Sequence, residues 1–231
     1  NPNVKPETTE LALRLQSEAV LGEYVRRLAD IFRQLTHSSQ LCTPSKAFMD
    51  SLNQDENIRF EVFKTKPTIY SQAPYRRKIA FMRYRLQQNL DRTRARIYQK
   101  TVDNSARPHA YRDENAFLED HYVIRDSLYS HGDRKIADLV LKDFIRLVES
   151  FGFYLLHLEV RQESSRHTEA VAEILRQMDP DLDYDSLNEQ QRIALLSENI
   201  KNPNIRFELD RSQLSENNLE TIDVFETMER M

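Results

Sequence analysis

The sequence predicts a mainly α-helical chain with one buried strand, and three observations lead to this prediction. Charged residues make up 30% of the 231 residues and glycine occurs only 3 times, which favours long exposed helices over a glycine-rich nucleotide-binding fold. Apolar residues recur at three- and four-residue steps along most of the chain, the period of amphipathic helices. The exception is an apolar, aromatic-rich run at residues 153–160, which lies between Gly152 and a polar loop and is typical of a buried strand.

The first element is a long helix over residues 6–35. Pro6 suits a first helical turn, and Glu7 and Glu10 follow closely, as the positive end of a helix dipole favours. Gly22 is the weak point within it. The apolar positions are Leu11, Leu15, Ala19, Leu28, Ile31 and Leu35. Thr43 and Pro44 then predict a cap and first-turn proline for a shorter helix, which includes Phe48 and Leu52.

Residues 53–73 lose the helical period and predict a loop with one irregular helical piece, although alternation over residues 58–62 leaves a short strand open. Pro74 begins the next long helix, which is rich in arginine and includes Arg76 and Arg77. Such a basic run can bind phosphate or nucleic acid. The alternative, favoured for most of its residues, is a solvated face whose side-chain stems cover apolar surface.

Residues 103–112 predict a linker, and a helix follows from Asp113 to Gly132. His121 lies on the apolar stripe of that helix, where a hydrogen-bonded core histidine is favoured over a ligand. A further amphipathic helix from Ile136 to Phe151 ends at Gly152, where the predicted strand begins. Arg161 closes that strand, as a functional arginine or as the ion-pair partner of a nearby carboxylate.

The C-terminal part predicts three more helices. Ser164 or Ser165 is expected to cap the first, and residues 179–185 resemble a calcium loop only superficially, so they predict a solvated turn. Residues 186–189 predict a capping box for the second helix. The last helix has its apolar positions at Leu219, Ile222 and Phe225.

Composition excludes several classes of function. The net charge of −4 implies no general attraction to nucleic acid or to an anionic membrane. The single Cys42 predicts neither a disulfide framework nor a cysteine metal cluster, which fits a reducing cytoplasm. No metal-binding spacing, phosphate loop or complete catalytic set occurs in the sequence, and no apolar run reaches membrane-spanning length.

Residues 158–168 read L-E-V-R-Q-E-S-S-R-H-T, which resembles the L-D-I-R-Q-E-S-x-R-H-T segment of the phosphoenolpyruvate carboxylase family. Three more segments resemble that family in its own order: residues 1–4, residues 74–76 and residues 132–138. They match the end of G-G-D-R-D-G-N-P-N-V, the motif P-Y-R and the motif G-D-x-x-I-A-D-G. Glu159 replaces the family's aspartate, and Leu139 its last glycine.

The resemblance implies a lyase of carbon dioxide fixation that supplies the tricarboxylic acid cycle. Such enzymes convert phosphoenolpyruvate and bicarbonate to oxaloacetate and phosphate through carboxyphosphate and an enolate, with Mg²⁺ or Mn²⁺. Arg161 then matches an active-site arginine, which we expect to act as an electrostatic clamp on the phosphoryl or carboxyphosphate group. Gln162, Glu163, Arg166 and His167 would bind substrate or support the loop, and Arg76 and Arg77 would bind a phosphorylated effector.

The resemblance also implies a larger protein. The family's catalytic histidine and metal ligands match no segment here, so we expect an internal fragment that is inactive alone, binds no metal, and comes from a homotetramer. The fold expectation becomes long helices around one barrel-type strand at about 153–161, excised from a (β/α)8 barrel with large helical insertions. Its parts would be a helical insertion at 1–112, a helix–strand–helix unit at 113–178 and a helical part at 179–231. The alternative is a non-enzymatic α-helical interaction scaffold.

Overall fold

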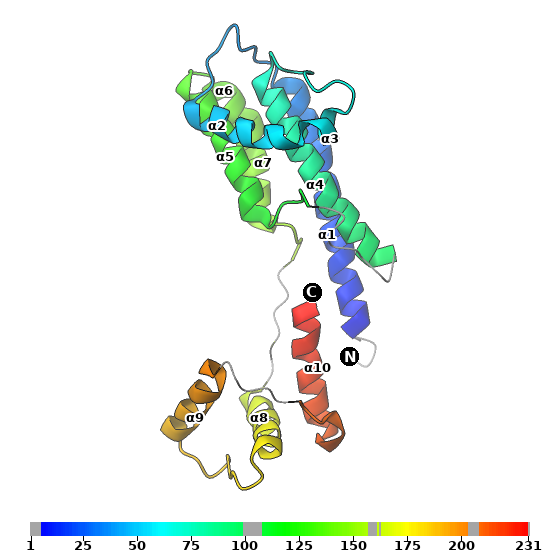
Figure 1. Ribbon diagram of the computed structural model, residues 1–231, viewed down its shortest axis with the longest axis vertical. Helices are drawn as coiled ribbons and strands as arrows, with labels where there is room; N and C mark the ends of the chain where they lie inside the picture. The colour runs from blue at the N-terminus through cyan, green and yellow to red at the C-terminus, as the bar shows by residue number, and fades with distance from the viewer. Residues whose placement is uncertain (1–5, 99–107, 157–160, 162, 203–207, 231) are drawn as a thin grey trace. The chain divides into compact units, whose positions relative to one another are not determined.

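The computed structural model describes residues 6–98, 108–156, 161, 163–202 and 208–230, and within these ranges the regular structure is entirely helical. The described chain forms two compact units (Figure 1). One unit is Leu11–His157, and the other is Leu158–Met231 with the first residues of the chain. The prediction of a mainly helical chain is confirmed.

The larger unit is built around two long helices, α1 (Pro6–Gln34), from Leu11 onward, and α4 (Pro74–Tyr98). α1 runs through Gly22 without a break, and α4 begins at the predicted proline. Leu11 and Leu15 are each 44% exposed, so the buried apolar residues of α1 start only at Val20. From there it includes Leu21, Tyr24, Leu28, Ile31 and Leu35.

The other helices of the larger unit lie, along the chain, between α1 and α4 and after α4. They are α2 (Lys46–Asp55), the turn η1 (Glu56–Ile58), α3 (Arg59–Phe63), α5 (Glu114–Ser130), α6 (Arg134–Ile136), the π-helical turn η3 (Ala137–Leu141) and α7 (Lys142–Phe151). Residues 58–62 are therefore helical and not a strand. One apolar core joins these helices, with Phe117 and Phe144 in ring contact at its centre.

The predicted strand at 153–161 is wrong where the structure describes it, and residues 157–160 lie outside the described ranges. Residues 153–156 form a turn and bends after Gly152. An extended segment needs a neighbouring strand for its backbone groups, and the described residues include none. Helical side chains bond these carbonyls instead: Ser17 donates to the Phe153 oxygen over 2.9 Å and Tyr24 to the Gly152 oxygen over 2.8 Å.

The smaller unit consists of α8 (Ser164–Met178), α9 (Glu189–Lys201), the turn η4 (Arg211–Gln213) and α10 (Glu216–Arg230). α8 packs against α10, and a small apolar cluster of Ala172, Leu175 and Tyr184 lies at its core. Residues 179–185 contain turns and no helix, as predicted.

Two caps lie two residues beyond their predicted positions. Ser45, not Thr43, caps α2, with its hydroxyl accepting from Phe48 N. Asn188, not Ser186, forms the capping box of α9 with Gln191. At α8 the N-cap position is Glu163, and Ser164 and Ser165 are already helical.

Candidate functional site

Arg161, the predicted catalytic residue, is exposed and lies just before α8. Glu163 is also exposed and occupies the N-cap position of α8 without a side-chain capping bond. The first turn of α8 contains no acidic residue, so Glu163 at the N-cap is the nearest acidic residue in the sequence to the positive end of its dipole. The segment therefore combines a guanidinium with a helix N-terminus, and both favour an anion. Gln162 lies outside the described residues.

Arg166 and His167 point toward α10. Arg166 forms an ion pair of 3.6 Å with Glu220, and the His167 ring lies 5.5 Å from that of Phe225. Both side chains are half-buried. In this arrangement they join the start of α8 to α10, which positions the segment that carries Arg161.

Arg76 and Arg77, the predicted effector residues, belong to the larger unit and have different surroundings. Arg76 is half-buried, stacks on Phe32 and donates to the carbonyls of Phe32 and Arg33 over 3.2 Å each, at the end of α1. Arg77 is 6% exposed, and its guanidinium donates hydrogen bonds to both carboxylate oxygens of Glu56. Arg77 also donates to two further carbonyls, those of Pro67 and Ile69. These bonds occupy most of its donors.

A cavity of about 600 Å³ lies beside Arg77. Its apolar lining comes from Pro44, Met49, Leu52, Pro67 and Pro74, and its polar lining from Ser39, Thr43, Asn53, Glu56, Arg59, Thr68, Ser71 and Arg77. Glu56 pairs with Arg77, so of the three charged residues in the lining only Arg59 is left without a carboxylate partner in the cavity.

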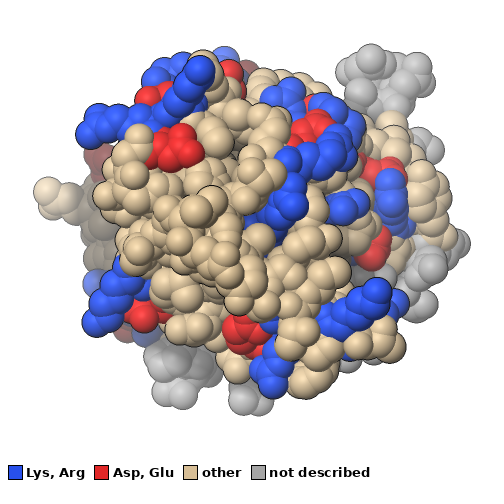
Figure 2. Space-filling model, turned by 90° about the horizontal axis from the view of Figure 1, so that it is seen from above, with Lys and Arg blue, Asp and Glu red and all other residues tan. Residues whose placement is uncertain are grey.

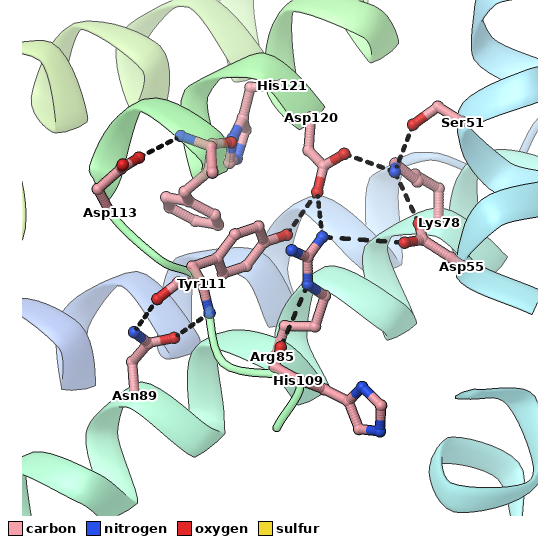
Figure 3. A network of polar contacts seen from close by, with 12 residues as sticks. Ser51, Asp55, Lys78, Arg85, Asn89, His109, Tyr111, Asp113, Asp120 and His121 are labelled. Atoms are coloured by element: carbon pink, nitrogen blue, oxygen red, sulfur yellow. Dashed lines mark hydrogen bonds and ion pairs between the residues drawn. The ribbon is translucent and has the colours of Figure 1, made fainter. Parts of the chain in front are cut away.

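A buried polar network connects α2, α4 and α5 (Figure 3). The Lys78 ammonium is 1% exposed and lies 2.6 Å from a carboxylate oxygen of Asp55 and 2.6 Å from one of Asp120. Arg85 and the Tyr111 hydroxyl both donate to the second oxygen of Asp120, over 3.1 and 2.7 Å. Two cations and two carboxylates balance in charge, so each ion has its partner.

Burial shifts the pKa of two members of this network. It raises the pKa of Asp55, although Lys78 opposes the shift, and it raises the pKa of Tyr111 well above its usual range. Lys78 belongs to the basic run of α4, most of which is expected on a solvated face, but it is buried. The overlooked signal is its spacing: Lys78 lies three residues after Tyr75 and four before Met82, on the apolar stripe of α4.

His121 is a buried core histidine, as its place on the apolar stripe predicts. Its Nδ1 lies 2.7 Å from the Phe117 carbonyl, and its ring contacts those of Phe117 and Phe144. Burial lowers the pKa of His121 to about 4. The ring is therefore neutral at pH 7, with Nδ1 as the donor.

Within the described ranges, no three His, Cys, Asp or Glu side chains come together as a metal site would require. None of the described helices has the length and apolar character of a membrane span.

Comparison with known proteins identifies the family to which this chain belongs. A sequence model of the phosphoenolpyruvate carboxylase family matches residues 1–231, the whole chain. The chain therefore belongs to the phosphoenolpyruvate carboxylase family, whose members are lyases.

Individual proteins similar to this chain are members of the same family. The phosphoenolpyruvate carboxylase of Thermosynechococcus vestitus is 34% identical over 228 residues, which cover 96% of this chain and 22% of the relative. That of Synechococcus sp. WH7803 is 33% identical over 249 residues, with 100% of this chain and 24% of the relative covered. That of Roseiflexus castenholzii is 32% identical over 203 residues, which cover 88% of this chain and 22% of the relative. The chain thus spans less than a quarter of the length of these relatives.

Proposed function

We propose that this chain is part of a phosphoenolpyruvate carboxylase, which converts phosphoenolpyruvate and bicarbonate to oxaloacetate and phosphate. The observation that carries the proposal is the family match over all 231 residues together with the R-Q-E-S-S-R-H-T segment at 161–168. Because the chain spans only 22% to 24% of the compared relatives, we assign turnover to the whole protein and expect none from this chain alone.

Arg161 is the residue proposed to touch the reacting group. The reaction moves negative charge between phosphate, carboxylate and enolate oxygens, so cations placed in advance lower its barrier. A guanidinium suits this role because its planar fork binds two oxygens and keeps its charge at any working pH. The exposure of Arg161 and its place before α8 support this role. Arg166 and His167 are proposed as positioning residues.

The proposal includes a requirement of the whole enzyme for Mg²⁺ or Mn²⁺, which would stabilise the enolate. The described residues do not fit such an ion, because they provide no group of three ligating side chains. We therefore assign its ligands to other parts of the parent protein and assign to this chain the holding of the phosphoryl or carboxyphosphate anion.

The test is oxaloacetate formation by the whole parent protein, with the variants Arg161→Ala and Arg161→Lys. Loss of an electrostatic clamp should lower kcat by about 10²–10³ for Arg161→Ala. Arg161→Lys should restore only part of the lost kcat, because a lysine ammonium lacks the planar two-pronged geometry of the guanidinium. Arg176→Ala, an exposed arginine at the end of α8, is the matched control and should stay near normal.

Each other outcome has a definite meaning. Near-normal activity of Arg161→Ala would make Arg161 structural and place the site in other segments. A folded but inactive parent protein would favour the α-helical scaffold. Turnover by the isolated 231-residue chain would contradict the claim that it is inert.

We also propose that Arg76 contributes to binding a phosphorylated effector in the whole enzyme, which we expect to be a homotetramer. Arg76 is only half-buried, whereas Arg77 is buried against Glu56. Titration of activity with a phosphate ester should weaken in Arg76→Ala. An unchanged titration in a variant lacking both arginines would remove this part of the proposal.

A further inference from the structure

The ion pair between Arg166 and Glu220 holds the start of α8 only weakly. The two charged groups lie 3.6 Å apart, and their side chains are 39% and 71% exposed. Exposed ion pairs of this kind contribute little to stability. They are also common on this chain, since Figure 2 shows Asp and Glu beside Lys and Arg around the face that it displays. The direction in which α8 presents Arg161 must therefore depend on further contacts.

Glu173 of α8 makes such a contact at the start of α10. Ser215 immediately precedes α10, and its carbonyl accepts a helical bond from Leu219 N over 2.9 Å. The Ser215 backbone N–H has no place in the helical bonding and donates to Glu173 Oε2 over 3.0 Å. The Asn218 side chain, which is 3% exposed, donates to the same carboxylate. A residue of α8 thus closes the first turn of α10.

The electrostatics of Glu173 agree with this role. The side chain is half-buried, and burial by itself would raise its pKa, but the hydrogen bonds from Asn218 and Ser215 outweigh burial and lower that pKa. The carboxylate is therefore ionised at pH 7 and accepts from both donors. Its negative charge also suits the positive end of the α10 dipole.

Three polar contacts run along one face of α8 and set its register against the α10 segment. Seven- and four-residue steps separate the three residues of α8, which places them on one face of a helix: Arg166, Glu173 and Gln177. Their partners follow in the reverse order along the chain: Glu220, Ser215 and Asp210. Gln177 exchanges two hydrogen bonds of 3.0 Å with the Asp210 backbone. Within the described ranges the apolar cluster of the smaller unit contains no residue of α10, so these directional contacts fix the register.

We propose that Glu173 is a positioning residue for Arg161, which it serves by holding α8 against the start of α10. The inference rests on the proposed carboxylase function, in which Arg161 touches the reacting group. An active-site side chain must be held within about 0.5 Å of its productive place. A small shift of α8 therefore lowers the rate, although Glu173 itself contacts no substrate.

The test is a double-mutant cycle on oxaloacetate formation by the whole parent protein, with Glu173→Ala, Arg161→Ala and the double variant. Glu173→Ala should lower kcat about tenfold, as misplacement of a reacting group does. In the Arg161→Ala background the same substitution should cost less than about twofold, because Glu173 acts through Arg161. A mere loss of folded protein would instead multiply with the loss caused by Arg161→Ala.

Two further variants make the test specific. Glu173→Gln keeps an oxygen acceptor for the Ser215 N–H, and its amide can donate to Asn218 Oδ1, which has no hydrogen-bond partner among the described residues. This variant should recover most of the kcat lost in Glu173→Ala. Glu198→Ala, which changes an exposed glutamate of α9, is the matched control and should stay near normal.

The outcomes separate this inference from the proposed function. If Arg161→Ala is impaired, a near-normal Glu173→Ala, independent losses in the double variant or no recovery in Glu173→Gln would each overturn the role of Glu173 alone. Near-normal activity of Arg161→Ala would overturn the role of Arg161 and, with it, that of Glu173.

Discussion

Lys78 is a single side chain on which the packing of three helices depends. It lies on α4, and its two carboxylate partners, Asp55 and Asp120, come from α2 and α5. Ser51 completes its bonding at 2.8 Å. A buried ammonium is stable only with such a full set of partners, and its removal leaves two buried carboxylates with Arg85 as their one remaining cation in the network.

We therefore expect Lys78→Met to lower the free energy of unfolding by about 3–5 kcal/mol. Methionine keeps the length of the side chain, so the loss reports the missing charge rather than a cavity. Chemical denaturation measures it. Lys135→Met, an exposed lysine on α6, is the control and should change stability by less than about 0.5 kcal/mol. A small effect of Lys78→Met would mean that water enters the network.

His121 makes stability depend on pH. Its folded pKa of about 4 lies below the ordinary value of 6.5, so between these values the unfolded chain binds a proton that the native chain does not. Stability must then fall as the pH falls from 6.5 to 4, by about 3 kcal/mol in total. His121→Leu should flatten the unfolding free energy over this window. If the unfolding free energy of the variant still depends on pH between 4 and 6.5, another titrating group causes that dependence.

At the scale of elements, the ends of helices depend on contacts as well as on residue type. Thr43 and Ser45 are both good N-cap residues, and the sequence does not choose between them. The structure favours Ser45 because its backbone N–H donates to the Ser127 hydroxyl of α5 over 2.9 Å. A contact 82 positions away along the chain therefore decides where α2 begins.

The end of α7 depends on the backbone of Gly152, which has φ +53° and ψ −138°, a region that favours glycine. A Cβ there would meet the Glu114 side chain at an ordinary 3.5 Å, so the cost of Gly152→Ala should be conformational, about 1–3 kcal/mol.

Gly22→Ala is the opposite case and the matched control. Gly22 lies within α1, and no atom lies within 4 Å of an added Cβ. Alanine should stabilise the helix by about 0.5–1 kcal/mol. Thermal or urea unfolding should move in opposite directions for the two variants. A shift in the same direction would contradict the assigned conformations.

At the scale of the whole molecule, the described chain has two hydrophobic clusters, one in each unit. The larger unit contains an extensive core, whereas the cluster of the smaller unit has three buried members, Ala172, Leu175 and Tyr184. A small core buries little apolar surface, so the smaller unit should open at lower free energy than the larger one.

A matched pair of leucines tests this division by hydrogen exchange. Leu28→Ala and Leu175→Ala each remove a buried leucine, at 0% and 6% exposure, and each should cost about 2–5 kcal/mol within its own unit. Faster exchange should stay within Leu11–His157 for the first variant and within α8–α10 for the second. Faster exchange in both units from either variant would show that they unfold together.

The sequence by itself determined the helices and the family. Periodic apolar residues, prolines at helix starts and Gly152 at a helix end are local signals, so α1, α4, α5 and α7 could be predicted closely. The R-Q-E-S-S-R-H-T segment is local too, and it indicated both the family and Arg161.

Only the tertiary structure decided which distant residues pair with one another, because such pairing leaves no local pattern in the sequence. Lys78 reads as a surface lysine until α2 and α5 bring Asp55 and Asp120 to it. Residues 153–156 read as the start of a strand, yet among the described residues no strand is present to pair with them. Their backbone instead turns against α1, where Ser17 bonds the Phe153 carbonyl. A strand is defined by its neighbours and a helix largely by its own residues, which is why the helices were predicted and this strand was not.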